Sequence, residues 1–156
     1  MCNACVTVES VVRSQGGSWF GSGRPNVSKN KLLTRCVQIW LERDPATKCY
    51  MPGVPRATYM PFPFQLVQTP EYVLLAYEFA SASRIVYMDR PDFEAPVDSW
   101  MGHNIGSWDG DTLVIDVTAQ MPDAWLDQSG NHHSNSIHVV ERYTAMSENH
   151  LMYEAT

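Results

Sequence analysis

The sequence has no long hydrophobic run and no cluster of basic residues. No stretch approaches the roughly 18 consecutive apolar residues that a membrane-spanning helix needs. The net charge is −6, and an acidic chain without a Lys/Arg cluster neither neutralises nucleic acid phosphates nor is attracted to anionic lipids. We therefore expect no nucleic acid partner and no membrane. The first residues, MCNACVTVESVVR, lack a basic region followed by an apolar block, so we expect no secretion signal and a cytoplasmic location.

Residues at metal-ligand spacing are also scarce. The four cysteines include one CxxC pair, Cys2 and Cys5, but no second close pair, so we expect reduced thiols rather than a zinc site. Histidines crowd into one stretch, SGNHHSNSIHVVERY, at positions 132, 133 and 138. Neighbouring histidines seldom hold one ion together, and the third lies in an expected strand away from the first two. We expect no metal and no other cofactor.

The 156 residues fit one domain preceded by an irregular arm. Residues 1–27 include SQGGSWFGSGRPN, which is typical of a flexible arm because it is rich in Gly and Ser. Residues 28–156 are expected to form a single β-rich domain. It begins with an amphipathic helix at about 29–43, where apolar side chains fall within one half of a helical wheel. Asp44-Pro45 ends this helix, since the residue before proline avoids the α region.

The rest of the domain is expected to be mainly β. Residues 49–63 hold so many prolines that we expect no helix there, only a rigid extended segment packed on an apolar surface. Asp109-Gly110 lies between two alternating stretches and predicts a hairpin with a type I′ turn. A long loop is expected at 119–134. The pattern predicts an antiparallel meander that forms a lipocalin-like barrel or a strongly curved sheet. Its expected strands are 64–69, 72–79, 83–89, 101–108, 111–118, 135–145 and 150–156.

Several stretches resemble a family of uncharacterised bacterial proteins from environmental genomes. They are CYMPGVPRATYMPFPFQLVQTP (49–70), WMGHNIGSWDGDTLVIDVT (100–118), WLDQSGNHHS (125–134) and HVVERY (138–143). His132 departs from the family pattern, which has proline there. Family members usually carry a secretion signal and further sequence on both sides, so the chain resembles a trimmed version of the kind that a gene cassette encodes. GSWDGDTLVIDV is also similar to a hairpin of lipocalin-like barrels. The resemblance implies no catalytic residue.

Acid–base catalysis is one functional hypothesis. The candidates are His133, His138, Glu141 and Asp116, which could transfer protons in a metal-independent hydrolase or isomerase if they lined one cavity. Strand alternation, however, sends His138 and Glu141 to opposite faces of a sheet. The alternative is that both are structural residues. The enzyme hypothesis requires a histidine and a carboxylate within hydrogen-bonding distance in the same cavity.

Binding of a small apolar or amphipathic ligand is the function that the sequence favours most. Aromatic side chains are abundant, and they either line a pocket or fill the core. A third hypothesis is a homo-oligomeric structural or interaction protein, because an exposed last strand can pair with a second copy. The candidate ligand-binding residues are Arg56, Tyr59, Tyr77, Tyr87, Trp100, Trp108 and Trp125.

Overall fold

The structure is a computed structural model that describes residues 42–156. The expected arm at 1–27 and nearly all of the expected helix at 29–43 lie outside the described residues. None of the described helices is long and apolar enough to cross a membrane.

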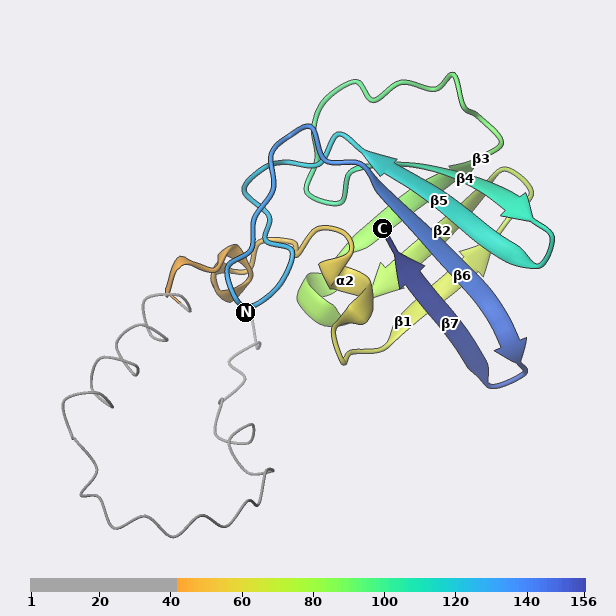
Figure 1. Cartoon of the computed structure of the whole chain (residues 1–156), viewed down its shortest axis with the longest axis horizontal. Coiled ribbons are helices and arrows are strands. Elements are labelled where there is room, and N and C mark those ends of the chain that lie inside the picture. Colours follow the sequence, from red (N-terminus) through yellow and green to blue (C-terminus); the bar gives the residue numbers. More distant parts are fainter. Residues whose placement is uncertain (1–41) are drawn as a thin grey trace, which may run out of the picture.

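One seven-stranded sheet, with its strands side by side in sequence order, dominates the fold. The strands are β1 (Phe64–Gln68), β2 (Tyr72–Tyr77), β3 (Ser83–Met88), β4 (His103–Asp109), β5 (Thr112–Thr118), β6 (Val139–Ser147) and β7 (His150–Ala155). Figure 1 shows this sheet curled into a half-barrel with α2 (Arg56–Tyr59) beside it. The expectation of a mainly β, strongly curved sheet is therefore confirmed.

The strand order is that of a meander, but one pair of neighbouring strands is parallel rather than antiparallel. β3 and β4 are parallel, with Val86 opposite Asn104 and Met88 opposite Gly106. All the other neighbouring pairs are antiparallel. The chain leaves β3 and crosses through residues 89–102 before it enters β4, because a parallel partner must be entered from the same end of the sheet.

Two local expectations need correction. Residues 49–63 do contain a helix, the single turn α2, which follows the cis bond between Val54 and Pro55. Proline is tolerated at the start of a helix, where its missing N–H has no partner to lose. In the β4–β5 hairpin Asp109 pairs with Thr112, so the turn residues are Gly110 and Asp111. Only Gly110 of these two has positive φ, as in a type II′ turn.

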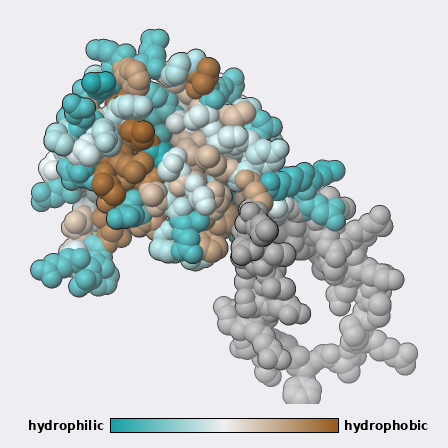
Figure 2. All heavy atoms as spheres, turned by 180° about the vertical axis from the view of Figure 1, so that it is seen from behind, coloured by the Kyte–Doolittle hydropathy of each residue, from teal (hydrophilic) through white to brown (hydrophobic). Residues whose placement is uncertain are grey.

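The sheet alternates between an inner face that is buried and an outer face that is largely exposed. The outer face also carries hydrophobic side chains, and Figure 2 shows such side chains gathered on part of the surface seen from behind. The strand register places Val67, Leu74 and Ile85 side by side on the outer face, and we call these three residues the outer-face patch. The inner-face residues of the hydrophobic core include Val73, Leu75, Val86, Met88, Leu113, Ile115, Val117 and Val139.

Two shorter 3₁₀ helices complete the fold, η1 (Pro45–Lys48) and η2 (Phe79–Ser81). Asp44 caps η1, because its Oδ1 accepts a hydrogen bond from the Ala46 N–H at 3.0 Å. Cys49 follows η1 and is disulfide-bonded, which corrects the expectation of a reduced thiol at this position, whereas the other three cysteines lie outside the described residues.

Candidate functional site

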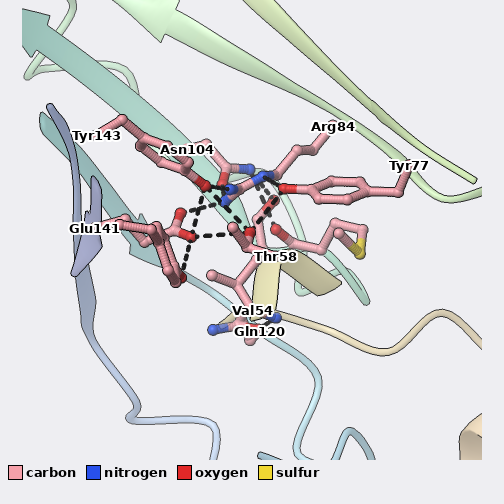
Figure 3. Close-up of polar contacts among 11 residues, drawn as sticks. Val54, Thr58, Tyr77, Arg84, Asn104, Gln120, Glu141 and Tyr143 are labelled. Carbon is pink, nitrogen blue, oxygen red and sulfur yellow. Dashed lines mark hydrogen bonds and ion pairs between the residues drawn. The ribbon is translucent and has the colours of Figure 1, made fainter. Parts of the chain in front are cut away.

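A cluster of polar side chains lies buried on the concave side of the half-barrel (Figure 3). At its centre, Nη1 of Arg84 on β3 lies 2.5 Å from Oε2 of Glu141 on β6, and the two side chains are 1% and 0% exposed. Arg84 also donates to the Tyr77 and Tyr143 hydroxyls at 3.0 Å and to Asn104 Oδ1 at 2.9 Å. A buried guanidinium is tolerated only when such partners replace water. Arg84 thereby links β2, β3, β4 and β6.

Glu141 accepts hydrogen bonds from several hydroxyls besides the guanidinium. Tyr153 on β7 donates to its Oε1 at 2.7 Å and Tyr143 at 3.1 Å, and Thr58 of α2 lies 3.4 Å away. Thr58 also lies 3.1 Å from the hydroxyls of both Tyr77 and Tyr143. Thr58 therefore fixes α2 against the sheet. We call Thr58, Tyr77, Arg84, Asn104, Glu141, Tyr143 and Tyr153 the buried polar cluster.

The protonation states in this cluster follow from burial and from the central ion pair. Burial raises the pKa of the Tyr77, Tyr143 and Tyr153 hydroxyls, and the negative charge of Glu141 adds to this effect. Burial alone would lower the pKa of Arg84, but attraction to Glu141 and to the tyrosines raises it. The tyrosines therefore stay neutral hydrogen-bond donors and Arg84 stays a cation. The cluster is satisfied internally, which is the arrangement expected of a structural element.

The predicted acid–base residues do not share a cavity. Glu141 is on the inner face, inside the buried polar cluster. His138 and Asp116 lie on the outer face, where Nε2 of His138 is 2.8 Å from Oδ1 of Asp116 and the side chains are 55% and 51% exposed. His133 lies in the loop before β6, and its Nδ1 is 2.8 Å from the carbonyl oxygen of Ser134. The structure thus brings together only His138 and Asp116, as a solvent-exposed pair.

A second buried ion pair holds the start of the described chain against α2. Arg56 donates from both terminal nitrogens to the Asp44 carboxylate, at 2.9 and 2.7 Å. Nearby, the buried Gln120 side chain accepts a hydrogen bond from the Val54 N–H at 2.8 Å. Position 53 is occupied by glycine, and a larger residue would clash there, because its Cβ would lie only 2.9 Å from the Cβ of Ala124. Gly53 and Val54 therefore pack against Gln120 and Ala124 of the loop after β5.

A cleft of about 540 Å³ lies beside these packed segments. Its walls come from the ends of η1, from Trp100 and from the loop after β5. The Tyr50 and Trp100 rings stack with centroids 4.9 Å apart and planes at 21°. The cleft, which we call the aromatic cleft, is lined by Arg43, Pro45, Lys48, Tyr50, Trp100, Pro122, Asp123, Trp125 and His132.

The loop after β5 is ordered by its own hydrogen bonds on this side. Trp125 forms an isolated β-bridge with His132, and the Leu126 N–H donates to the Asn131 carbonyl at 2.7 Å. Asp127 accepts hydrogen bonds from the backbone N–H and the side chain of Asn131, and the side-chain bond lowers the pKa of the Asp127 carboxyl. The loop therefore presents Trp125 and His132 on a hydrogen-bonded scaffold.

A smaller cleft of about 380 Å³ lies along the β3–β4 junction. The Tyr87 ring meets Phe93 edge-on, with centroids 4.8 Å apart. His103 lies with Nε2 2.7 Å from the Phe93 carbonyl oxygen. The residues that line this cleft include Ile85, Tyr87, Pro96, Val97, Met101 and His103. It offers a largely apolar surface, and its one Arg or Lys residue is Arg84, whose guanidinium is committed to the buried polar cluster.

The seven candidate ligand-binding residues are distributed over separate places. Trp100 and Trp125 meet in the aromatic cleft, whereas Tyr87 lines the smaller cleft. Tyr77 belongs to the buried polar cluster and Arg56 to the ion pair with Asp44. The remaining two are exposed elsewhere: Trp108 near the end of β4, and Tyr59, whose hydroxyl donates to the carbonyl oxygen of Leu126.

Sequence reasoning missed the basic side of the aromatic cleft. Arg43, Lys48 and Tyr50 lie within one short stretch, and this local combination of two cations and an aromatic ring was the available signal. Among residues 42–156, neither Arg43 nor Lys48 forms an ion pair.

The described residues also contain no group of three or more His, Cys, Asp or Glu side chains placed to hold a metal ion.

Comparisons with protein-family models, with curated proteins and with solved structures gave no match to this chain.

Proposed function

We propose that this protein binds a small amphipathic molecule in the aromatic cleft, with an aromatic ring against the tryptophans and an anionic group toward the basic residues. One observation carries the proposal: Tyr50, Trp100 and Trp125 line the same cleft as Arg43 and Lys48. Ligand sites are typically concave, largely aromatic or apolar, and supplied with a few polar groups that orient the ligand. The volume of about 540 Å³ is within the usual range for such sites.

The charges of the cleft favour an anion over a cation. Arg43 and Lys48 are exposed cations at one side, and Asp123 is the carboxylate among the lining residues. Exposed charges interact weakly in water, so the aromatic surfaces supply most of the affinity. The two cations supply the preference for an anionic over a cationic ligand. Stacking on an aromatic ring contributes roughly 0.5–1.5 kcal/mol beyond the burial of area.

Catalysis by the predicted acid–base residues has weaker support. His138 and Asp116 lie on the outer face, outside the aromatic cleft, and Glu141 is engaged by Arg84 and Tyr153. Catalytic groups usually lie in a low-dielectric site that excludes water, whereas the His138–Asp116 pair is about half exposed.

The test compares two fluorescent probes that share a ring system. 8-Anilinonaphthalene-1-sulfonate carries an anionic group, and N-phenyl-1-naphthylamine is its neutral counterpart. We expect the sulfonate to bind more tightly. Trp100→Ala should weaken both probes, and Lys48→Gln should weaken only the sulfonate, by roughly 2–5-fold, which corresponds to the usual range for an exposed charge pair.

Two control variants distinguish probe binding in the aromatic cleft from probe binding at other surfaces. Trp108→Ala removes an exposed tryptophan near the end of β4 and should leave both affinities unchanged. Ile85→Ser reduces both the outer-face patch and the smaller cleft, which are competing apolar surfaces for such probes. If Ile85→Ser abolishes probe binding while Trp100→Ala leaves it intact, the aromatic cleft is not the ligand site.

A further inference from the structure

The last strand of the sheet has an open edge with a defined set of backbone groups. Among the described residues β7 pairs only with β6. Thr156 and Val140 exchange both of their backbone hydrogen bonds, at 2.9 and 3.0 Å. Such pairs recur at every second residue of an antiparallel ladder, so the N–H and C=O groups of Leu151, Tyr153 and Ala155 point away from β6.

This edge lacks lysine and proline, which are two of the usual protections against pairing. Edge strands are commonly protected by lysine or proline, and β1, at the opposite edge of the sheet, is flanked by Pro63 and Pro70. β7 has the sequence HLMYEA, without lysine or proline. It also exposes hydrophobic side chains, since Leu151 is 46% and Met152 is 42% exposed. An edge strand that lacks lysine and proline and exposes apolar side chains is suited to pairing with another strand.

The sequence of β7 is self-complementary when a second copy runs antiparallel about Met152. In this register Leu151 lies opposite Tyr153 of the second copy, so the edge-facing backbone groups meet and can exchange both hydrogen bonds. On the outer face Met152 lies opposite Met152 of the second copy. His150 lies opposite Glu154 of the second copy, and symmetry repeats this pair on the other side of Met152.

We propose that β7 pairs with β7 of a second copy of this chain, antiparallel and with its twofold axis at Met152, so that two half-barrels share one continuous sheet. The two His150–Glu154 contacts select this register over its neighbours, because an imidazole faces a carboxylate only here. The interface contains no residue of the aromatic cleft, so the proposal is independent of ligand binding.

The first test measures the oligomeric state of the full chain by sedimentation velocity over a range of concentrations. We expect a monomer–dimer equilibrium. His150→Glu places glutamate opposite glutamate, and Glu154→Lys places lysine opposite histidine. Each should raise the dimer dissociation constant by about 5-fold or more, because each change affects two symmetric contacts. The double variant H150E/E154K places glutamate opposite lysine and should recover dimerisation. A wild-type chain that stays monomeric throughout overturns the proposal.

The second test reads the register directly through cross-linking. Met152→Cys places two thiols opposite each other across the axis, where facing Cβ atoms of a non-hydrogen-bonded pair lie within disulfide reach. Mild oxidation should give a cross-linked peptide that contains residue 152 from both chains, detected by mass spectrometry. Met146→Cys is the control, since Met146 is 62% exposed but lies on β6. Equal cross-linking of the two variants overturns the register, and so does a wild-type level of dimer in both single charge variants.

Discussion

The buried tyrosines predict a steep loss of stability at alkaline pH. Burial raises the pKa of the Tyr143 and Tyr153 hydroxyls far above the value near 10 of an unfolded chain. A raised pKa in the folded state gives stability that is fully present below the unfolded pKa. That stability is lost as pH rises above about 10, because only the unfolded state then releases the proton.

The magnitude follows from proton linkage. A tyrosine that ionises only in the unfolded state lowers the free energy of unfolding by about 1.4 kcal/mol between neutral pH and pH 11. Tyr143 and Tyr153 together contribute about 2.8 kcal/mol, and Tyr77 acts in the same direction. Because small domains are stable by only about 5–15 kcal/mol, this loss is a large fraction of the total.

Tyr153→Phe isolates one of these contributions. At neutral pH the variant lacks the 2.7 Å hydrogen bond to Glu141 and should be less stable by about 1.5–3 kcal/mol, the usual range for a hydrogen bond to a charged group. Between pH 8 and pH 11, however, it should lose about 1.4 kcal/mol less than the wild type.

Urea unfolding followed by far-ultraviolet circular dichroism at several pH values measures both effects. The control is Tyr72→Phe, which removes an exposed tyrosine outside the buried polar cluster and should keep the wild-type slope. The reasoning is refuted if Tyr153→Phe and the wild type lose the same free energy between pH 8 and pH 11.

Two further predictions concern packing and ion pairs, and each is measured by chemical denaturation at neutral pH. Glu141→Gln leaves the buried Arg84 without a counterion and should destabilise the protein by about 3–5 kcal/mol, whereas His138→Ala breaks an exposed pair and should change stability by less than about 1 kcal/mol. Equal effects would contradict the assignment of Glu141 to a buried structural pair and of His138 to the surface. Gly106→Ala places a Cβ 2.6 Å from Cγ1 of Val86 and should cost about 1–3 kcal/mol through overpacking of the β3–β4 pair, while Ser107→Ala on the exposed face next to it should be close to neutral. A neutral Gly106→Ala would show that the parallel pair can move apart.

The strands were predictable from the sequence because their side chains alternate and their turns are short. The sequence LVID, within β5, sends Leu113 and Ile115 to one face and Val114 and Asp116 to the other, and the structure has the same division. The same alternation correctly separated His138 from Glu141. Local patterns of this kind are set by neighbouring residues and need no knowledge of the rest of the chain.

The parallel pairing of β3 and β4 was not predictable in this way. A hydrophobic pattern reports which face a side chain occupies but not the direction of the neighbouring strand. The length of the 89–102 connection was the only local indication, since a parallel neighbour needs a crossover of a dozen or more residues. α2 was missed for a related reason, because its single turn is held by Thr58 contacts with Tyr77 and Tyr143.

The sequence by itself determined the class of fold, the seven strands and the inward or outward direction of most strand side chains, since these depend on periodicities of a few residues. Only the tertiary structure decided which polar residues meet. Arg84 and Glu141 are far apart in the sequence, as are Tyr50 and Trp100, yet each pair is in contact. Curling of the sheet brings Arg84 and Glu141 together: the inner face becomes narrow enough for one guanidinium to reach hydroxyls on both β2 and β6. No property of the individual segments contains that information.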